Sequence, residues 1–107
     1  MKLLTKSLEK KLRDNSSAQD GSKSFAAVVK LFNPAGTGTW YLSELDDNGI
    51  AYGLCDLGYP ELGYVSLDEL SRYNGAFGLG IERDRYFDAN KLKLEDIKST
   101  LDAGGHV

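Results

Sequence analysis

The stretch TWYLSELDDNGIAYGLCDL, residues 39–57, decides which fold this sequence favours. Residues 39–45 alternate with the two-residue period of a strand, with Trp40 and Leu42 on one face and Tyr41 and Ser43 on the other. A second strand-like run follows at residues 50–57. The Asn48-Gly49 pair between the two runs tolerates positive φ, so we predict a β-hairpin here.

The flanking residues extend this hairpin into a small sheet. Residues 25–32 are rich in β-branched and aromatic side chains, residues 61–65 predict a short fourth strand, and residues 81–87 predict a fifth strand. Because the runs follow one another closely, antiparallel pairing is expected. The fold class predicted is therefore α+β, with a mostly antiparallel sheet of four or five strands and its helices on one side.

Two helices are expected after the first four strands. Ser66-Leu67-Asp68-Glu69 has the pattern of a capping box, which begins a helix of about two turns that ends at a left-handed cap at Asn74-Gly75. A final helix is marked by apolar residues at helical spacing and ended by Gly104-Gly105. Those apolar residues are Leu94, Ile97 and Leu101.

An N-terminal helix precedes the sheet. Leu4, Leu8 and Leu12 share one face of residues 1–13, with lysines on the other, which predicts a short amphipathic basic helix. Residues 14–24 hold one apolar side chain and indicate a flexible linker, and residues 25–107 form a single α+β domain. Packing of the helix on its own domain is the favoured interpretation, and binding to a partner is the alternative.

Composition and charge narrow the class of protein. The chain of 107 residues has net charge −3, with +4 on residues 1–13 and −7 on the rest. No apolar run approaches the roughly 20 residues that span a bilayer, so no membrane partner is expected. The lysines interrupt any signal peptide, and a single Cys55 fits a reducing compartment, so we expect a cytoplasmic protein.

The residues capable of catalysis are few and far apart in the sequence. A reactive thiolate at Cys55 needs a nearby base, and the single histidine, His106, lies in a Gly-rich tail. The adjacent Asp56 would raise the thiol pKa, so Cys55 is interpreted as a small core residue. Gly36-Thr37-Gly38 precedes a strand, which favours a turn over a phosphate loop. We predict no catalytic residue, no metal site and no cofactor.

Acidic and tyrosine side chains are the most distinctive polar feature. Asp56 and Glu61 flank the tight turn Gly58-Tyr59-Pro60, where capping of the turn is favoured and a binding role is the alternative. Arg83 and Arg85 are interpreted as partners in cross-strand ion pairs. The candidate acidic and aromatic binding surface consists of Asp56, Tyr59, Glu61, Tyr64, Glu82 and Asp84.

Direct binding of nucleic acid is disfavoured. Residues 25–88 hold four bases against ten acids, so counterion release would contribute little affinity. The alternative is a weak, salt-sensitive arm at the N-terminus. That arm would consist of Lys2, Lys6, Lys10, Lys11 and Arg13.

Three segments of this sequence carry a family resemblance: GLCDLG (53–58), PELGYVSL (60–67) and IERD (81–84). With KLFNP (30–34) upstream, they resemble an uncharacterised domain-of-unknown-function family. Its members are small bacterial proteins or modules encoded on conjugative plasmids, integrative elements and phage-like islands, sometimes beside antirestriction genes. The resemblance implies a mobile-element accessory protein and supplies no catalytic residues.

We therefore expect a non-enzymatic interaction protein of a bacterial mobile element. Its partner would be a host or element-encoded protein such as a restriction or CRISPR nuclease complex, bound through the acidic, Tyr-rich surface. One alternative is a nucleic-acid-binding accessory of plasmid transfer or maintenance that uses the basic N-terminal helix. Another is a small metal-dependent enzyme built around Asp56 and Glu61.

Overall fold

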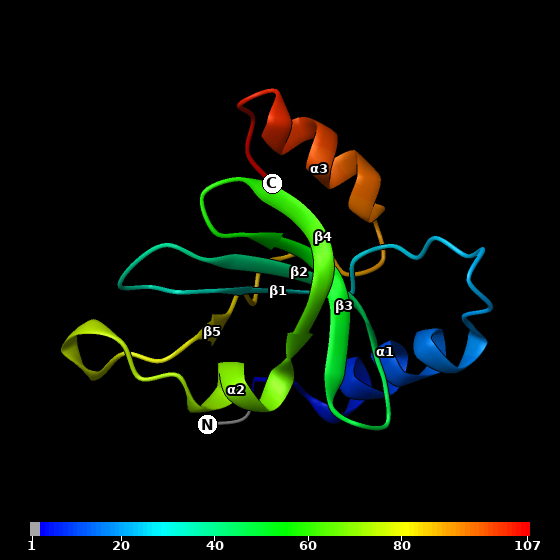
Figure 1. Cartoon of the computed structure of the whole chain (residues 1–107), viewed down its shortest axis with the longest axis horizontal. Coiled ribbons are helices and arrows are strands. Elements are labelled where there is room, and N and C mark those ends of the chain that lie inside the picture. The colour runs from blue at the N-terminus through cyan, green and yellow to red at the C-terminus, as the bar shows by residue number, and fades with distance from the viewer. Residues whose placement is uncertain (1–2) are drawn as a thin grey trace.

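The computed structural model describes residues 3–107 and has the α+β architecture that the sequence predicts (Figure 1). The strands are β1 (Val29–Phe32), β2 (Thr39–Leu45), β3 (Ile50–Asp56), β4 (Pro60–Ser66) and β5 (Glu82–Arg83). The helices are α1 (Lys6–Ala18), α2 (Leu67–Arg72) and α3 (Leu94–Asp102), with one 3₁₀ turn, η1 (Ala76–Gly78).

All the strands join one antiparallel sheet in the order β4-β3-β2-β1-β5. The predicted hairpin pairs β2 with β3, and its turn is closed by the Gly49 amide, which donates to the Asp46 carbonyl at 3.2 Å. Gly49 has a φ of 78°, whereas Asn48 stays out of the left-handed region. One residue of the Asn-Gly pair therefore supplies the positive φ that the turn requires.

Helices cover both faces of the sheet, so the prediction that they lie on one side was wrong. The α1 and α2 face buries Leu12, Trp40, Leu42 and Leu70. The α3 face buries Tyr41, Leu54, Leu94 and Ile97. Figure 1 shows α3 above the sheet and α1 and α2 below it. The alternation of β2 and β3 allows this arrangement, because both sets of alternate side chains are apolar enough to need cover.

Helix α1 differs from its predicted bounds, because it begins at Lys6 and continues through residues 14–18 of the predicted linker. The extension follows from Asn15, which is buried and whose Nδ2 donates to the carbonyl oxygen of Ser43 at 2.9 Å. Ser43 is the extra residue of a β-bulge in β2, where the pairing with β3 shifts between Leu42 and Glu44. A bulged residue has no partner in the ladder, so the helix supplies one.

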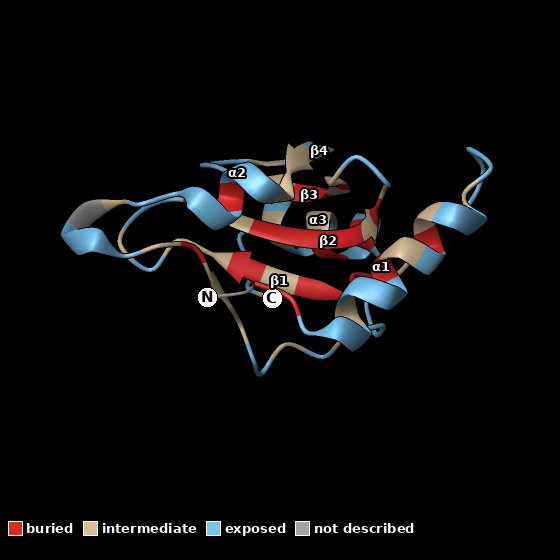
Figure 2. Ribbon diagram, turned by 90° about the horizontal axis from the view of Figure 1, so that it is seen from below, coloured by how far each residue is buried: buried red, intermediate tan, exposed pale blue. Residues whose placement is uncertain are grey.

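The α1 helix packs against β2 and exposes its polar side (Figure 2). Its N-cap is Thr5, whose side-chain oxygen accepts a hydrogen bond from the Leu8 amide at 3.2 Å. Leu3, Leu4 and Leu12 pack in the same cluster as the strand residues. The N-terminal helix therefore packs on its own domain, as the leucine spacing favoured.

The end of α2 also departs from the prediction. Ser66 caps its start as expected and accepts from the Glu69 amide at 3.2 Å. The predicted left-handed cap at Asn74-Gly75 was wrong, since neither residue has a positive φ and the C-cap that follows Arg72 is Tyr73 in extended geometry. Gly75 serves close packing instead, because a Cβ there would lie 2.7 Å from the Tyr73 ring.

Two predicted strands are shorter in the structure. Ala26 and Ala27 pair with the segment before α3 rather than lengthening β1, since the Ala27 amide donates to the Leu92 carbonyl at 2.8 Å. The fifth strand ends at Arg83 because the Asp84 carboxylate accepts from the Tyr86 amide at 2.9 Å and turns the chain. β5 is consequently a short edge, whereas β4 at the other edge has seven residues.

Candidate protein-binding surface

The sheet separates the predicted pair Asp56 and Glu61. Asp56 pairs with Pro60 and Cys55 pairs with Glu61, and paired residues of an antiparallel sheet point to the same face. Asp56 therefore lies on the α3 face with Leu54, whereas Glu61 lies on the opposite face with Cys55. This geometry does not bring the two carboxylates together, as a shared metal ion would require.

The two carboxylates also differ in their hydrogen bonds. Asp56 Oδ1 accepts from the Gly58 amide at 3.2 Å, which is the turn-capping role that its position favoured. Within residues 3–107 no hydrogen bond or ion pair to the Glu61 carboxylate is formed, and Glu61 is exposed. Glu61 is therefore available to a partner.

The candidates Glu82 and Asp84 lie at the far edge of the sheet, at β5 and just after it. Asp84 Oδ2 is 3.6 Å from Lys30 Nζ, and the Lys30 ammonium also lies 5.6 Å from the centre of the Tyr41 ring. Asp84 is thus partly neutralised within the fold. Arg83 faces the opposite side and its guanidinium donates to the Leu3 carbonyl at 2.7 Å, in place of the predicted cross-strand ion pair.

Four neighbouring exposed residues lie along the other edge of the sheet, where their side chains border both faces. Tyr59 is 66% exposed, Leu62 45% and Tyr64 76%. Leu62 and Tyr64 lie on the α3 face, whereas exposed Glu61 points to the opposite face of the same edge strand. We call these four residues the β4 surface. The sequence analysis named three of them and missed Leu62. The two-residue spacing of Leu62 and Tyr64 on a strand indicates that both side chains share one face.

Tyr64 is held in place by an aromatic neighbour. The rings of Tyr52 and Tyr64 are paired across β3 and β4 with centroids 5.0 Å apart and an interplanar angle of 56°. Burial raises the pKa of Tyr52, with smaller contributions from Tyr64, Glu44 and Glu95. The Tyr64 ring therefore presents a fixed and exposed aromatic face, which suits an interface.

Cys55 lies on the α1 and α2 face of β3, beside β4, and packs partly buried against the apolar cluster of that face. Burial raises the pKa of its thiol, and the charge of Glu61 on the paired residue raises it further. Asp56, which was expected to raise it, lies on the other face. A raised pKa disfavours the thiolate, which is consistent with a packing role.

The proposed basic arm is distributed around α1. Lys10 pairs with Asp14 at 2.7 Å, and Arg13 pairs with Glu9 at 3.0 Å and donates to the Asp46 carbonyl at 2.9 Å. Lys6 and Lys11 are exposed, and Lys2 lies outside the described residues. Half of the arm's four described bases are therefore already paired with acids of the same helix.

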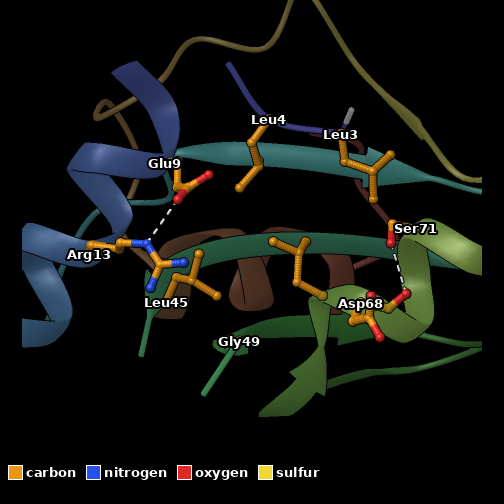
Figure 3. A pocket seen from close by; sticks show the side chains of 9 residues that line it. Leu3, Leu4, Glu9, Arg13, Leu45, Gly49, Asp68 and Ser71 are labelled. Carbon is orange, nitrogen blue, oxygen red and sulfur yellow. Dashed lines mark hydrogen bonds and ion pairs between the residues drawn. The ribbon is translucent and has the colours of Figure 1, made fainter. Parts of the chain in front are cut away.

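A groove of ≈ 390 Å³ lies between α1, α2 and the β2–β3 turn (Figure 3). Leu3, Leu4 and Leu45 form its apolar floor, with the Arg13–Glu9 ion pair on one wall and Asp68 on the other. Within residues 3–107 no three His, Cys, Asp or Glu side chains are arranged to hold a metal ion. No helix in this range is long and apolar enough to cross a membrane.

A family model described as "Protein of unknown function (DUF2958)" matches residues 3–104. The chain belongs to this family. The match spans the sheet and the helices on both faces, so the family domain includes α1 as well as the predicted core. No curated protein and no solved structure matches the chain.

Proposed function

We propose that this DUF2958 domain is a non-enzymatic interaction protein whose β4 surface binds a protein partner. The observation that carries the proposal is the row of exposed side chains Tyr59, Leu62 and Tyr64 along one edge of the sheet. Neighbouring exposed apolar and aromatic side chains mark contact surfaces, and tyrosine is among the residues that dominate binding energy.

The charge of the domain suggests the kind of partner. Residues 14–107 carry −7, and the unpaired carboxylate of Glu61 lies within the β4 surface. An acidic surface is attracted to a basic one and accelerates its association. Proteins that bind nucleic acid present such basic surfaces. We propose as partner a nuclease complex of the bacterial host, of the restriction or CRISPR type, which the domain inhibits in the cytoplasm on behalf of a mobile element.

A cleavage assay tests the inhibitory part of this proposal. Purified domain is added to purified restriction and CRISPR nucleases, and the rate of DNA cleavage is measured at near-physiological salt. Inhibition is expected for at least one nuclease class. Tyr59→Ala with Tyr64→Ala is expected to weaken inhibition at least tenfold, because truncation of interface hot spots costs about 2 kcal/mol or more.

Tyr86→Ala is the matched control, since Tyr86 is 96% exposed but lies near β5. This control should inhibit as well as the unaltered domain does. Equal losses at Tyr64 and Tyr86 would contradict the assignment of the β4 surface. Unchanged cleavage and unchanged plasmid transfer into a recipient with active defence would contradict the proposed partner class.

A further inference from the structure

The backbone of β4 is the main unpartnered feature of the same edge. β4 pairs with β3 on one side only, and in Figure 1 no helix or strand crosses in front of it. Proteins commonly protect such an edge with charges, bulges or a covering segment. Within residues 3–107 the protection of β4 is confined to Pro60 at its start and Glu61.

The hydrogen-bond pattern identifies which backbone groups point outward. The Leu67 amide donates to the Gly49 carbonyl at 3.0 Å, so these two residues form a hydrogen-bonded pair. Hydrogen-bonded and non-hydrogen-bonded pairs alternate along an antiparallel ladder. In the observed register, Glu61, Gly63 and Val65 therefore bond to β3. The amides and carbonyls of Leu62 and Tyr64 point away from it.

These outward groups have no partner in the described fold. Within residues 3–107 the hydrogen bonds outside the strand ladders leave the backbone of residues 60–65 unengaged. A segment added in antiparallel orientation would form hydrogen-bonded pairs with Leu62 and Tyr64. Its alternate residues would form the closer, non-hydrogen-bonded pairs with Glu61, Gly63 and Val65.

The side chains around these closer pairs define the chemistry of the added segment. Nothing lies within 4 Å of a Cβ built on Gly63, so there is room for a large side chain, and aromatic side chains cover such edge glycines well. The unpaired carboxylate of Glu61 favours a basic residue opposite it, and Val65 favours an apolar one.

The other face of β4 leaves room for the intervening residues. A hollow of ≈ 590 Å³ lies beside Tyr59 and Leu62, bordered by Lys98 and Asp102 of α3. A second hollow, of ≈ 220 Å³, lies beside Tyr64 and is bordered by Lys23 and Glu44. Residues opposite Leu62 and Tyr64 would point toward these hollows.

We infer that β4 accepts an extended segment of a partner protein as a sixth, antiparallel strand. From its N-terminus, the segment has an apolar residue opposite Val65, an aromatic residue opposite Gly63 and a basic residue opposite Glu61. One residue of any kind separates each of these from the next. This inference rests on the proposed function and adds the mode of binding. Strand addition gives affinity through main-chain hydrogen bonds and specificity through alternate side chains.

A fluorescein-labelled heptapeptide of sequence TVTFTKT is the probe for anisotropy titration. Its Phe faces Gly63 and its Lys faces Glu61 in the inferred register. The expected result is saturable binding to the unaltered domain, with ¹⁵N-NMR shifts and slowed exchange at the Leu62 and Tyr64 amides. Absence of binding up to millimolar protein would overturn the inference.

Two pairs of variants separate strand addition from side-chain contact. Leu62→Pro removes one outward amide without touching the β3 ladder and should weaken binding about tenfold, whereas Leu62→Thr retains the amide and should bind at least three times more tightly than the proline variant. Glu61→Lys should reverse the peptide's charge preference by about threefold toward TVTFTET. Circular dichroism confirms that each variant is folded.

The outcomes also distinguish this inference from the proposed function. Nuclease inhibition lost in Tyr64→Ala but unaffected by Leu62→Pro would leave the proposed function standing and overturn strand addition. Concentration-dependent dimers in sedimentation that disappear in Leu62→Pro would show β4 occupied by a second copy of the chain, and would equally overturn the inferred partner.

Discussion

Gly53 and Gly63 face each other across the β3–β4 pair, but their surroundings differ completely. A Cβ on Gly53 would lie 2.0 Å from the Tyr41 carbonyl oxygen and 2.8 Å from the Leu42 Cα. A Cβ on Gly63 meets nothing within 4 Å. Gly53 therefore permits the close approach of β2 beside the bulge at Ser43, whereas Gly63 leaves one face of the edge strand open.

Gly53→Ala is predicted to destabilise the fold by about 2–3 kcal/mol, because the contact is with backbone that cannot move aside. Gly63→Ala is the matched control and should change the free energy of unfolding by less than about 0.5 kcal/mol. Urea denaturation followed by circular dichroism measures both. Similar changes in the free energy of unfolding for the two variants would contradict the observed register of β2 against β3.

Cys55, the buried Tyr41 and the partly buried Tyr52 have raised pKa values, with burial as the largest cause in each. An acid whose pKa is raised by folding stabilises the fold fully below its unfolded pKa. That contribution is lost as the pH rises from the unfolded toward the folded value. Thermal stability should therefore decline above about pH 8.5 through Cys55, and again above about pH 10 through Tyr41 and Tyr52.

The reaction of Cys55 with Ellman's reagent tests the first of these losses. At pH 8 the native thiol should react at least tenfold more slowly than the thiol in urea, and Cys55→Ala should remove the decline between about pH 8.5 and 10. A native thiol that reacts as fast as the unfolded one would contradict this assignment.

At the scale of elements, α1 is joined to the sheet through a polar contact inside an apolar interface. Asn15 satisfies the carbonyl of Ser43, which the β-bulge removes from the ladder. Loss of a partner from a buried polar group costs about 1–3 kcal/mol. Asn15→Ala should therefore lower the free energy of unfolding by that amount, whereas Ser17→Ala, on the exposed side of α1, should change it by less than about 0.5 kcal/mol.

The same contact explains what sequence reasoning missed in α1. The leucine spacing predicted the buried side of the helix, but polar residues 14–18 resembled a linker because Asn15 forms its hydrogen bond to a bulge that the sequence does not mark. The β2–β3 hairpin was predicted correctly because alternation and Asn-Gly are local signals. Helix placement on two faces depends on how the whole sheet is covered, which local patterns do not encode.

The candidate surface was predictable only in part, because sequence patterns show which residues are neighbours along the chain but not how the strands pair. Tyr59, Glu61 and Tyr64 are close in sequence and lie on one strand edge. Asp56 is just as close, but its carboxylate caps the Gly58 turn, whereas the Glu61 carboxylate lies exposed on the opposite face. Glu82 and Asp84 lie far from this surface, because the strand order places β5 at the opposite edge of the sheet.

For the whole molecule, two apolar clusters on opposite faces share one sheet. Leu12→Ala on the α1 face and Ile97→Ala on the α3 face should each cost about 2–5 kcal/mol, since both side chains are fully buried. Each variant should still unfold in one cooperative transition when monitored by Trp40 fluorescence and by circular dichroism. Leu92→Ala, a partly exposed control, should cost less than about 1.5 kcal/mol.

The arrangement leaves the β4 edge as the part of the molecule with the greatest capacity to bind. Its aromatic side chains, its unpaired carboxylate and its outward backbone groups lie within seven residues. The opposite edge, by contrast, ends in a two-residue strand with its neighbouring acid paired to Lys30. We therefore expect partner binding to depend on one edge of the sheet.

The most direct test of this expectation is site-specific photo-crosslinking in bacteria that carry an active restriction or CRISPR nuclease. p-Benzoylphenylalanine replaces either Tyr64 on β4 or Tyr86 near β5, both of which are exposed. A discrete crosslinked species containing a nuclease subunit is predicted from position 64 and none from position 86. No adduct at position 64, or the same adduct from both positions, would contradict the account.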